Sequence, residues 1–228
     1  MTRAFWTAPR ITGLIYLVVV LTGIASLAYV PSQILVAGDD PRTVANLQAA
    51  PSLWRLGIAA GMACYLAFIA LPLSFYRWMA PVHRSAAQCM VLLAVLSVPM
   101  SLGNLGHQLE VLDLVTTPAA AAQDQVLRAL VRYRQGVLLA ELFWGLWLLP
   151  LGFLVLRSRA VPMLLGGLLI LGGLGYLIEV FGSVLWADWR GGWFTRPAAL
   201  GEIGTCLWLL VFGAKAPEPA TAAVRVAP

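Results

Sequence analysis

The sequence predicts an all-α integral membrane protein: a bundle of six transmembrane helices with both termini on the cytoplasmic side. Of its 228 residues, 61% are hydrophobic and 11% are charged, and the mean hydropathy is +0.84. A soluble domain carries about a quarter charged residues, so this composition belongs to the membrane class. Six apolar runs are long enough to cross about 30 Å of hydrocarbon. Two of the short loops between them carry only basic charges, which indicates the orientation in the membrane.

The predicted spans are, in order, Ile11–Val30, Leu56–Tyr76, Ala86–Leu105, Val137–Leu156, Leu164–Trp186 and Ala198–Phe212. The first run is too long for the apolar region of a signal peptide, so we interpret it as an uncleaved span. The third is expected to continue as helix toward Val115, with bends at Pro99 and Gly103. The sixth is short, and it needs Gly213 and its flanks or a thin local bilayer to cross.

Loop charge predicts the orientation. The loops Arg77–Arg84 and Arg157–Val161 are compact and carry only basic charges, and short basic loops stay on the cytoplasmic side. We therefore expect residues 1–10 to be a cytoplasmic N-terminus and residues 11–213 to form the transmembrane domain. Residues 214–228 are rich in Ala and Pro and are predicted to be a disordered cytoplasmic tail.

Glycines in two of the spans predict close helix packing. Gly57 and Gly61 share one face of the second span, and the fifth span carries Gly166, Gly167, Gly172, Gly173 and Gly175. Small residues let two helices approach and gain van der Waals contact in lipid.

Three glutamates lie inside separate apolar runs. With the predicted topology, Glu141 is roughly 6–10 Å below the outer face, Glu179 roughly 10 Å and Glu202 roughly 8 Å. An ionisable group in lipid costs several kcal/mol, so it usually faces a partner or a cavity. The glutamates are therefore candidate catalytic residues, or they hydrogen-bond to neighbouring groups and serve only to fix helix register.

Other polar groups are expected at the same depth. Asn104 and His107 are one helical turn apart and share a face, and Arg55 opens the second span, where it can pair with a glutamate. Trp144 lies beside Glu141 in the fourth span. The predicted outward-facing polar pocket is lined by Arg55, Asn104, His107, Glu141, Trp144, Glu179 and Glu202.

Several chemistries have no support in the sequence. His107 is followed by Glu110, but a carboxylate-bridged metal site needs a Glu-x-x-His pair on two helices, so no metal site is predicted. No phosphate-binding loop, dinucleotide fingerprint or Ser-His-Asp arrangement occurs, and no cofactor is expected. The arginines form no continuous run, so we interpret them as topology signals and expect no nucleic-acid partner.

A series of short motifs resembles one family. It includes Arg10-x-x-Gly13-Leu-x-Tyr16-Leu17, Asp39 followed by Asn46, Leu53-x-Arg55-Leu-Gly57, Phe143-Trp144-Gly145-Leu146-Trp147-Leu-Leu-Pro150-Leu-Gly152, Arg157-Ser158-x-x-x-Pro162, Leu165-Gly166-x-Leu168, Gly175-Tyr176-Leu177, and Glu202 with Trp208-Leu-x-x-x-Gly213. Together they resemble the bacterial multi-pass membrane proteins catalogued as domain-of-unknown-function family 4386. The resemblance covers roughly residues 10–213.

This resemblance implies a small all-helical protein of the bacterial cytoplasmic (inner) membrane, without an established activity. It marks Arg55, Asp39, Asn46 and Glu202 as positions that fit the family pattern, and it implies a cytoplasmic turn around Ser158 that leads into the fifth span.

Three functions stay open at this point. The first is a protein that binds a small apolar or amphiphilic molecule or a lipid, with the bilayer as its partner. The second is a membrane enzyme in which a buried glutamate acts as general acid on an isoprenoid-like substrate, with tryptophans stabilising a carbocation. The third is a structural subunit or scaffold whose glutamates specify packing.

Overall fold

The computed structural model describes residues 2–117, 123–189 and 191–214, and all regular structure in these ranges is helical. The elements are α1 (Thr2–Gly23), η1 (Ile24–Tyr29), α2 (Val30–Ile34), α3 (Asp40–Ala49), α4 (Pro51–Met79), α5 (Arg84–Thr116), α6 (Gln123–Ser158), α7 (Met163–Leu185) and α8 (Arg196–Val211). The all-α prediction is confirmed for the described residues. The predicted disordered tail lies outside them, apart from Ala214, which is buried.

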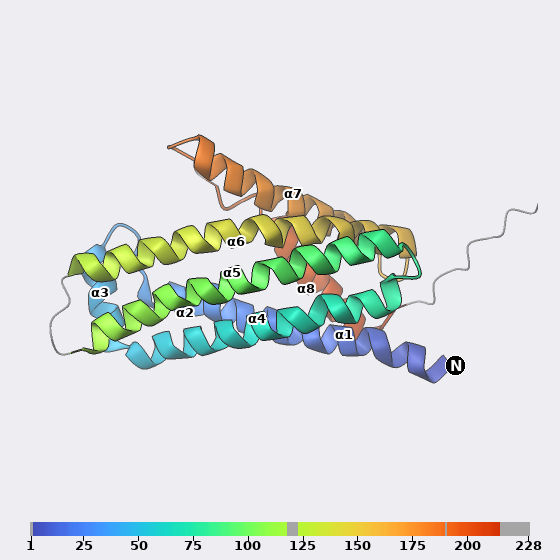
Figure 1. Ribbon diagram of the computed structural model, residues 1–228, viewed down its shortest axis with the longest axis horizontal. Coiled ribbons are helices and arrows are strands. Elements are labelled where there is room, and N and C mark those ends of the chain that lie inside the picture. Colours follow the sequence, from blue (N-terminus) through green and yellow to red (C-terminus); the bar gives the residue numbers. More distant parts are fainter. Residues whose placement is uncertain (1, 118–122, 190, 215–228) are drawn as a thin grey trace, which may run out of the picture.

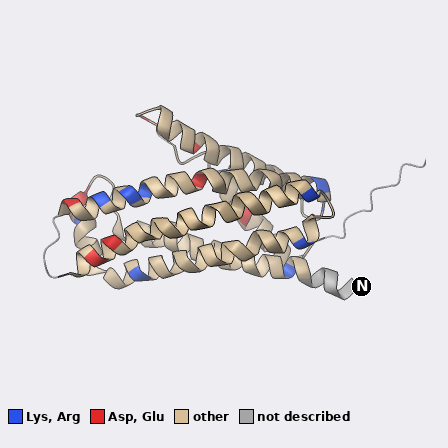
Figure 2. Cartoon of the chain, in the orientation of Figure 1, with Lys and Arg blue, Asp and Glu red and all other residues tan. Residues whose placement is uncertain are grey.

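Six helices form a closed ring. Going round it, α8 packs on α1, α1 on α4, α4 on α5, α5 on α6, α6 on α7, and α7 returns to α8. Figure 1 shows the long helices side by side, with the far part of α7 standing away from the others and α3 lying across one end. Charged residues gather toward the two ends of the bundle, with a few acidic positions between them (Figure 2).

Five of the helical segments in the described residues, rather than the predicted six, are long and apolar enough to cross a membrane. They are Ala8–Ile34, Pro51–Met79, Arg84–Thr116, Gln123–Ser158 and Met163–Leu185. The prediction of six transmembrane helices therefore fails at its last and shortest member, because α8 has 16 residues and rises only about 24 Å, less than the roughly 30 Å of a hydrocarbon core.

Two helices continue far beyond their apolar runs. The predicted extension of the third span is confirmed, since α5 runs on to Thr116. The fourth span was expected to begin at Val137, but α6 begins at Gln123. With 33 and 36 residues, these helices are about 50 and 54 Å long. They therefore project well beyond a bilayer of about 30 Å.

Because these helices are so long, their buried residues form two separate hydrophobic cores along the bundle. The larger lies between the apolar runs and includes Tyr16, Phe75 and Trp147. The smaller, which we call the end core, lies beneath α3 and consists of Val30, Ile34, Val44, Leu47, Trp54, Ile58, Val111, Val126, Ala129 and Leu130. The end core gives the projecting parts of α4, α5 and α6 a packed interior of their own.

Helix α3 lies in a stretch for which no element was expected. The Asp39 carboxylate accepts a hydrogen bond from the backbone N–H of Arg42 at 3.0 Å and so caps the helix. The Asn46 side-chain amide donates a hydrogen bond of 3.0 Å to the Ile34 carbonyl. This carbonyl lies at the end of α2 and has no partner within that helix. These two residues therefore hold α3 over the end core.

An irregular turn interrupts the first span. The segment η1 is a π-helix, in which each N–H bonds to the carbonyl five residues earlier. Pro31 follows it, and a proline ring has no N–H and collides with the carbonyl four residues before it in a regular helix. We attribute the wider turn to Pro31, because it moves the Leu27 carbonyl aside.

The predicted glycine packing is confirmed at most positions. A Cβ on Gly57 would meet Val30 at 2.9 Å, and one on Gly61 would meet the Ser26 hydroxyl at 2.8 Å. On α7, Gly166, Gly172, Gly173 and Gly175 each face a neighbouring helix or the loop before α8, whereas nothing lies within 4 Å of a Cβ on Gly167. The glycines thus allow the contacts that close the ring.

Candidate functional site

A cavity of about 260 Å³ lies inside the ring of helices. Its wall is built by α1, η1, α4, α6, α7 and α8. Six aromatic side chains line it: Tyr16, Tyr65, Phe68, Trp144, Trp147 and Tyr176. Among the described residues that line it, Glu202 is the only acidic one and none is basic. The cavity is therefore an aromatic chamber with one carboxylate.

Glu202 lies on α8 and reaches toward α1. Its Oε1 accepts a hydrogen bond from the Tyr16 hydroxyl at 3.3 Å, which joins two helices from opposite ends of the sequence. The Glu202 side chain is only partly buried, so it remains accessible from the cavity. Among the described residues it forms no ion pair, because the ion pairs present there both involve Glu110.

The aromatic rings are held by contacts with each other. Tyr65 stacks on Trp144 with ring centroids 6.3 Å apart and an interplanar angle of 28°. Phe68 meets Trp147 edge to face, at 5.0 Å and 87°. Such pairs fix ring orientation and add about 0.5–1.5 kcal/mol beyond the area they bury. The chamber walls are therefore formed by interlocked side chains.

The cavity reaches the lipid-facing side of the bundle between η1 and α8. Ile24 and Ala28 of η1 and Ala199 and Ile203 of α8 belong to its wall, and all four are exposed on the surface of the bundle. Because both helices lie in the apolar part of the molecule, this side faces acyl chains. The wall of the cavity therefore extends to the surface of the bundle between η1 and α8.

The other two predicted glutamates lie on neighbouring helices of the ring, outside the cavity wall. Glu141 is half-buried on α6, and Glu179 is half-buried on α7, which packs against α6. Tyr176 lines the cavity together with Glu202, and its Cβ lies against Gly145, one helical turn after Glu141 on α6. The structure thus places the three glutamates in one region.

Glu179 holds the loop that connects α7 to α8. Its Oε2 accepts a hydrogen bond from the backbone N–H of Gly192 at 2.9 Å. Further along, the Trp189 ring covers Gly182 and the Phe194 carbonyl lies against Gly175, so the loop runs back along α7. An irregular segment at this position leaves backbone groups without helical partners, and the glutamate satisfies one of them.

Replacing Glu179 by alanine is expected to loosen this loop. The change leaves the Gly192 N–H without its acceptor, and because this hydrogen bond is exposed the expected loss of local stability is about 0.5–1.5 kcal/mol. Amide hydrogen exchange of residues 186–195 should accelerate in Glu179→Ala. Glu179→Gln keeps a carbonyl oxygen at the same place and serves as control; equal exchange in both variants would contradict the role of the hydrogen bond.

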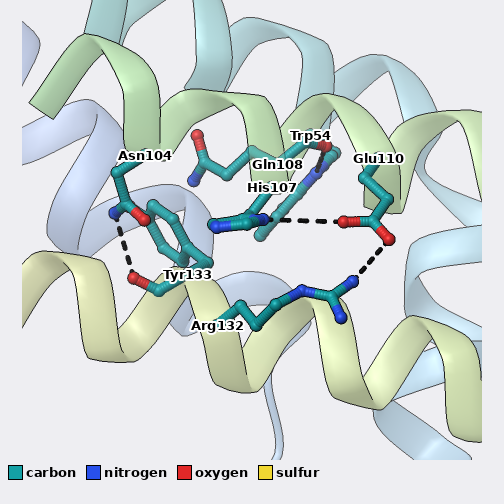
Figure 3. A network of polar contacts seen from close by, with 7 residues as sticks. All are labelled: Trp54, Asn104, His107, Gln108, Glu110, Arg132 and Tyr133. Atoms are coloured by element: carbon teal, nitrogen blue, oxygen red, sulfur yellow. Dashed lines mark hydrogen bonds and ion pairs between the residues drawn. The ribbon is translucent and has the colours of Figure 1, made fainter. Parts of the chain in front are cut away.

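Asn104 and His107 belong to a different group, at the α3 end of the bundle (Figure 3). The Asn104 amide donates to the Tyr133 carbonyl at 3.0 Å, which ties α5 to α6. His107 lies 3.5 Å from the Glu110 carboxylate, which also accepts a hydrogen bond from Arg132. Glu110 lies beyond the apolar run of α5, and the bond from Arg132 lowers the pKa of its carboxyl.

The predicted site residues therefore fall into separate places. Trp144 and Glu202 line the cavity, Glu141 and Glu179 lie beside it, and Asn104 and His107 form the polar contacts of Figure 3. Arg55 is exposed and forms no ion pair among the described residues. In the same part of the chain, no three His, Cys, Asp or Glu side chains gather as metal ligands would.

Five of the six aromatic residues in the wall were not predicted as site residues: Tyr16, Tyr65, Phe68, Trp147 and Tyr176. Each lies in an apolar run, where an aromatic residue usually packs in the core. Tyr16, Trp147 and Tyr176 do stand in the family motifs, and their polar atoms beside an intramembrane glutamate were a usable signal.

A domain of unknown function, DUF4386, matches residues 11–213 of the chain. The chain belongs to this family. No curated protein and no solved structure matches the chain. The family assignment together with the apolar helices makes this DUF4386 protein a multi-pass membrane protein.

The family-pattern positions have different surroundings in this DUF4386 protein. Asp39 and Asn46 hold α3 in place, and Glu202 lies in the cavity wall. Ser158 accepts a hydrogen bond from the Ala160 N–H at 3.3 Å and so stabilises the turn between α6 and α7. Of the family-pattern positions, Glu202 is the one that lines the cavity.

Proposed function

We propose that this DUF4386 protein binds a small amphiphilic molecule in the cavity around Glu202, taking it from the surrounding lipid. The observation that carries the proposal is an aromatic chamber inside the ring that has one carboxylate and a lateral opening. Ligand sites are typically apolar hollows of about 300–1,000 Å³ with a few polar groups that fix orientation. At about 260 Å³ this cavity suits a small ligand.

The proposal places the protein in the bacterial cytoplasmic membrane with both termini on the cytoplasmic side. The positions of α1 and α8 support a common side, because the backbone of Leu209 and Leu210, near the end of α8, fills the space beside Gly13, near the start of α1. In this arrangement α8 is the sixth helix to cross the membrane, and it is shorter than the hydrocarbon core is thick. The loop that runs back along α7 covers the rest of that thickness.

Two kinds of group in the cavity wall contact the ligand: aromatic rings contact its apolar part, and polar groups contact its polar end. The aromatic rings shield the apolar part of the ligand, which gains about 0.8 kcal/mol for each buried methylene group when it comes from water and much less when it comes from lipid. For a molecule already in the bilayer, recognition therefore depends on the polar end. Glu202 and the Tyr16 hydroxyl are the groups that meet it.

Photo-crosslinking with a long-chain alcohol that carries a diazirine tests this proposal. In lipid nanodiscs, labelled peptides should concentrate in η1 and α8, at the rim of the cavity. Ala199→Phe narrows the lateral opening and should reduce this labelling several-fold. Ala59→Phe changes another exposed alanine that is outside the cavity wall, and it should leave the labelling unchanged. Labelling spread evenly over all lipid-facing helices would contradict the proposal.

Acid catalysis is a second candidate, favoured by the position of Glu202 among aromatic rings. A protonated carboxyl group in an apolar chamber can donate a proton to a double bond, and ring faces stabilise the resulting carbocation. Incubation with a panel of polyprenyl compounds tests it. A product formed by the wild type and lost in Glu202→Gln would support an enzyme, whereas unchanged substrates across the panel would oppose it.

A further inference from the structure

The membrane region around the cavity carries acidic side chains that have no basic partner among the described residues. Neither Glu141, Glu179 nor Glu202 forms an ion pair with a basic side chain in the part of the chain that the structure describes. The contacts of Glu179 and Glu202 are with a backbone N–H and a tyrosine hydroxyl. An ionised carboxylate in a medium of low dielectric is strongly stabilised by a nearby cation.

The aromatic rings of the cavity wall can bind an organic cation together with the Glu202 carboxylate. Six aromatic rings surround the space that Glu202 reaches, and the face of an aromatic ring attracts an organic cation, most strongly where water is absent. The wall includes two indole rings, which are the best acceptors for this interaction; Trp144 is half-buried, whereas Trp147 is buried in the wall. A cage of this kind favours ammonium groups, whose charge is spread over apolar substituents, over small hydrated metal ions.

We propose that the ligand of this cavity is a lipophilic organic monocation, an amine or quaternary ammonium compound whose charged end lies against Glu202 and whose substituents lie between the aromatic rings. This inference rests on the proposed function and adds the charge class of the ligand. The lateral opening between η1 and α8 is compatible with it, since alkylammonium compounds partition into membranes with their apolar part among the acyl chains.

A matched pair of compounds tests the role of the charge. Benzyltrimethylammonium and 2,2-dimethylpropylbenzene have the same shape and differ in replacing the nitrogen by carbon. Both compete against the diazirine-bearing alcohol in nanodiscs, and their concentrations in the membrane are measured with empty nanodiscs. On the wild type the cation should displace the label at a concentration about tenfold or more below that of the neutral compound, since a desolvated cation–π contact and an ion pair both act on it.

The variant Glu202→Gln identifies the group that recognises the charge. The cation should lose the part of its advantage that the ion pair contributes and keep only the part from the aromatic rings, so the preference should fall several-fold, while the neutral compound competes as before and so shows that the variant is folded. Glu179→Gln removes another glutamate of the same region that lies outside the cavity wall and should keep the preference for the cation.

The outcomes separate this inference from the proposed function. Equal competition by the two compounds on the wild type would overturn the cation class and leave cavity binding intact. Absence of label from η1 and α8 at the outset would overturn the proposed function itself. If neither compound competes for the label on Glu202→Gln, the charge class of the ligand is decided by the competition of the two compounds on the wild type.

Discussion

Gly173→Ala is expected to destabilise the folded bundle by about 1–3 kcal/mol. A Cβ at this position would lie 2.7 Å from the Gly145 carbonyl oxygen and 2.8 Å from Leu149 Cδ2. The carbonyl belongs to the backbone of α6 and cannot turn away, so α6 and α7 must separate. Because packing of small residues drives helix association in lipid, this separation removes the contacts that hold the ring at α7.

Gly167→Ala provides the matched control on the same helix. Nothing lies within 4 Å of a Cβ there, and alanine is a better helix former than glycine by about 0.8–1.0 kcal/mol in soluble helices. Thermal unfolding in detergent should therefore give a lower midpoint for Gly173→Ala and an unchanged or higher one for Gly167→Ala. Equal midpoints for the two variants would mean that α6 and α7 are not in contact at Gly173.

Trp54→Ala is expected to cost about 3–5 kcal/mol, the usual cost of removing a buried tryptophan ring. Trp54 is 1% exposed in the end core, and its Nε1 donates to the Gln108 carbonyl at 3.0 Å. The loss should be confined to that core, because the larger core lies elsewhere along the bundle. Amide exchange should rise in α3 and in the first turns of α6, while the middle of α6 stays protected.

Trp186→Ala is the control for this prediction, because Trp186 is 59% exposed and its removal should leave exchange in α3 unchanged. Trp54→Phe separates the ring from its hydrogen bond. It keeps much of the packing and leaves the Gln108 carbonyl without its indole donor, so an intermediate effect is expected. Uniform acceleration along α6 in Trp54→Ala would show that the two cores unfold as one unit.

The apolar runs were sufficient to predict most of the membrane helices, because length and hydropathy are local properties of the chain. They did not predict α3 or the first part of α6. These segments contain many polar residues, and they are stable because one face packs into the end core. The α8 helix was recognised by its apolar composition, and its predicted bounds, Ala198–Phe212, are within two residues of the observed Arg196–Val211; the loop that returns along α7 and its hydrogen bond to Glu179 were not predicted.

Part of the candidate site was predictable from the sequence for the same reason. A glutamate in an apolar run is conspicuous, so Glu202 was found without knowledge of its neighbours. Its partner Tyr16 is 186 residues away in the sequence, and only the closure of the ring brings the two together. The aromatic walls were missed because Phe68 and Tyr65 have the same pattern as core residues.

The π-helical turn has a geometric consequence for the first span. Tyr16 and Ile34 are both buried and lie 18 positions apart, and 18 residues of a regular helix make five complete turns, so a regular helix would return Ile34 to the face of Tyr16. Because each N–H of η1 bonds five residues back, its turn is wider than a regular turn and rotates less for each residue. The part of the span after η1 is therefore turned away from the face of Tyr16, and one continuous rod directs Tyr16 into the larger core and Ile34 into the end core.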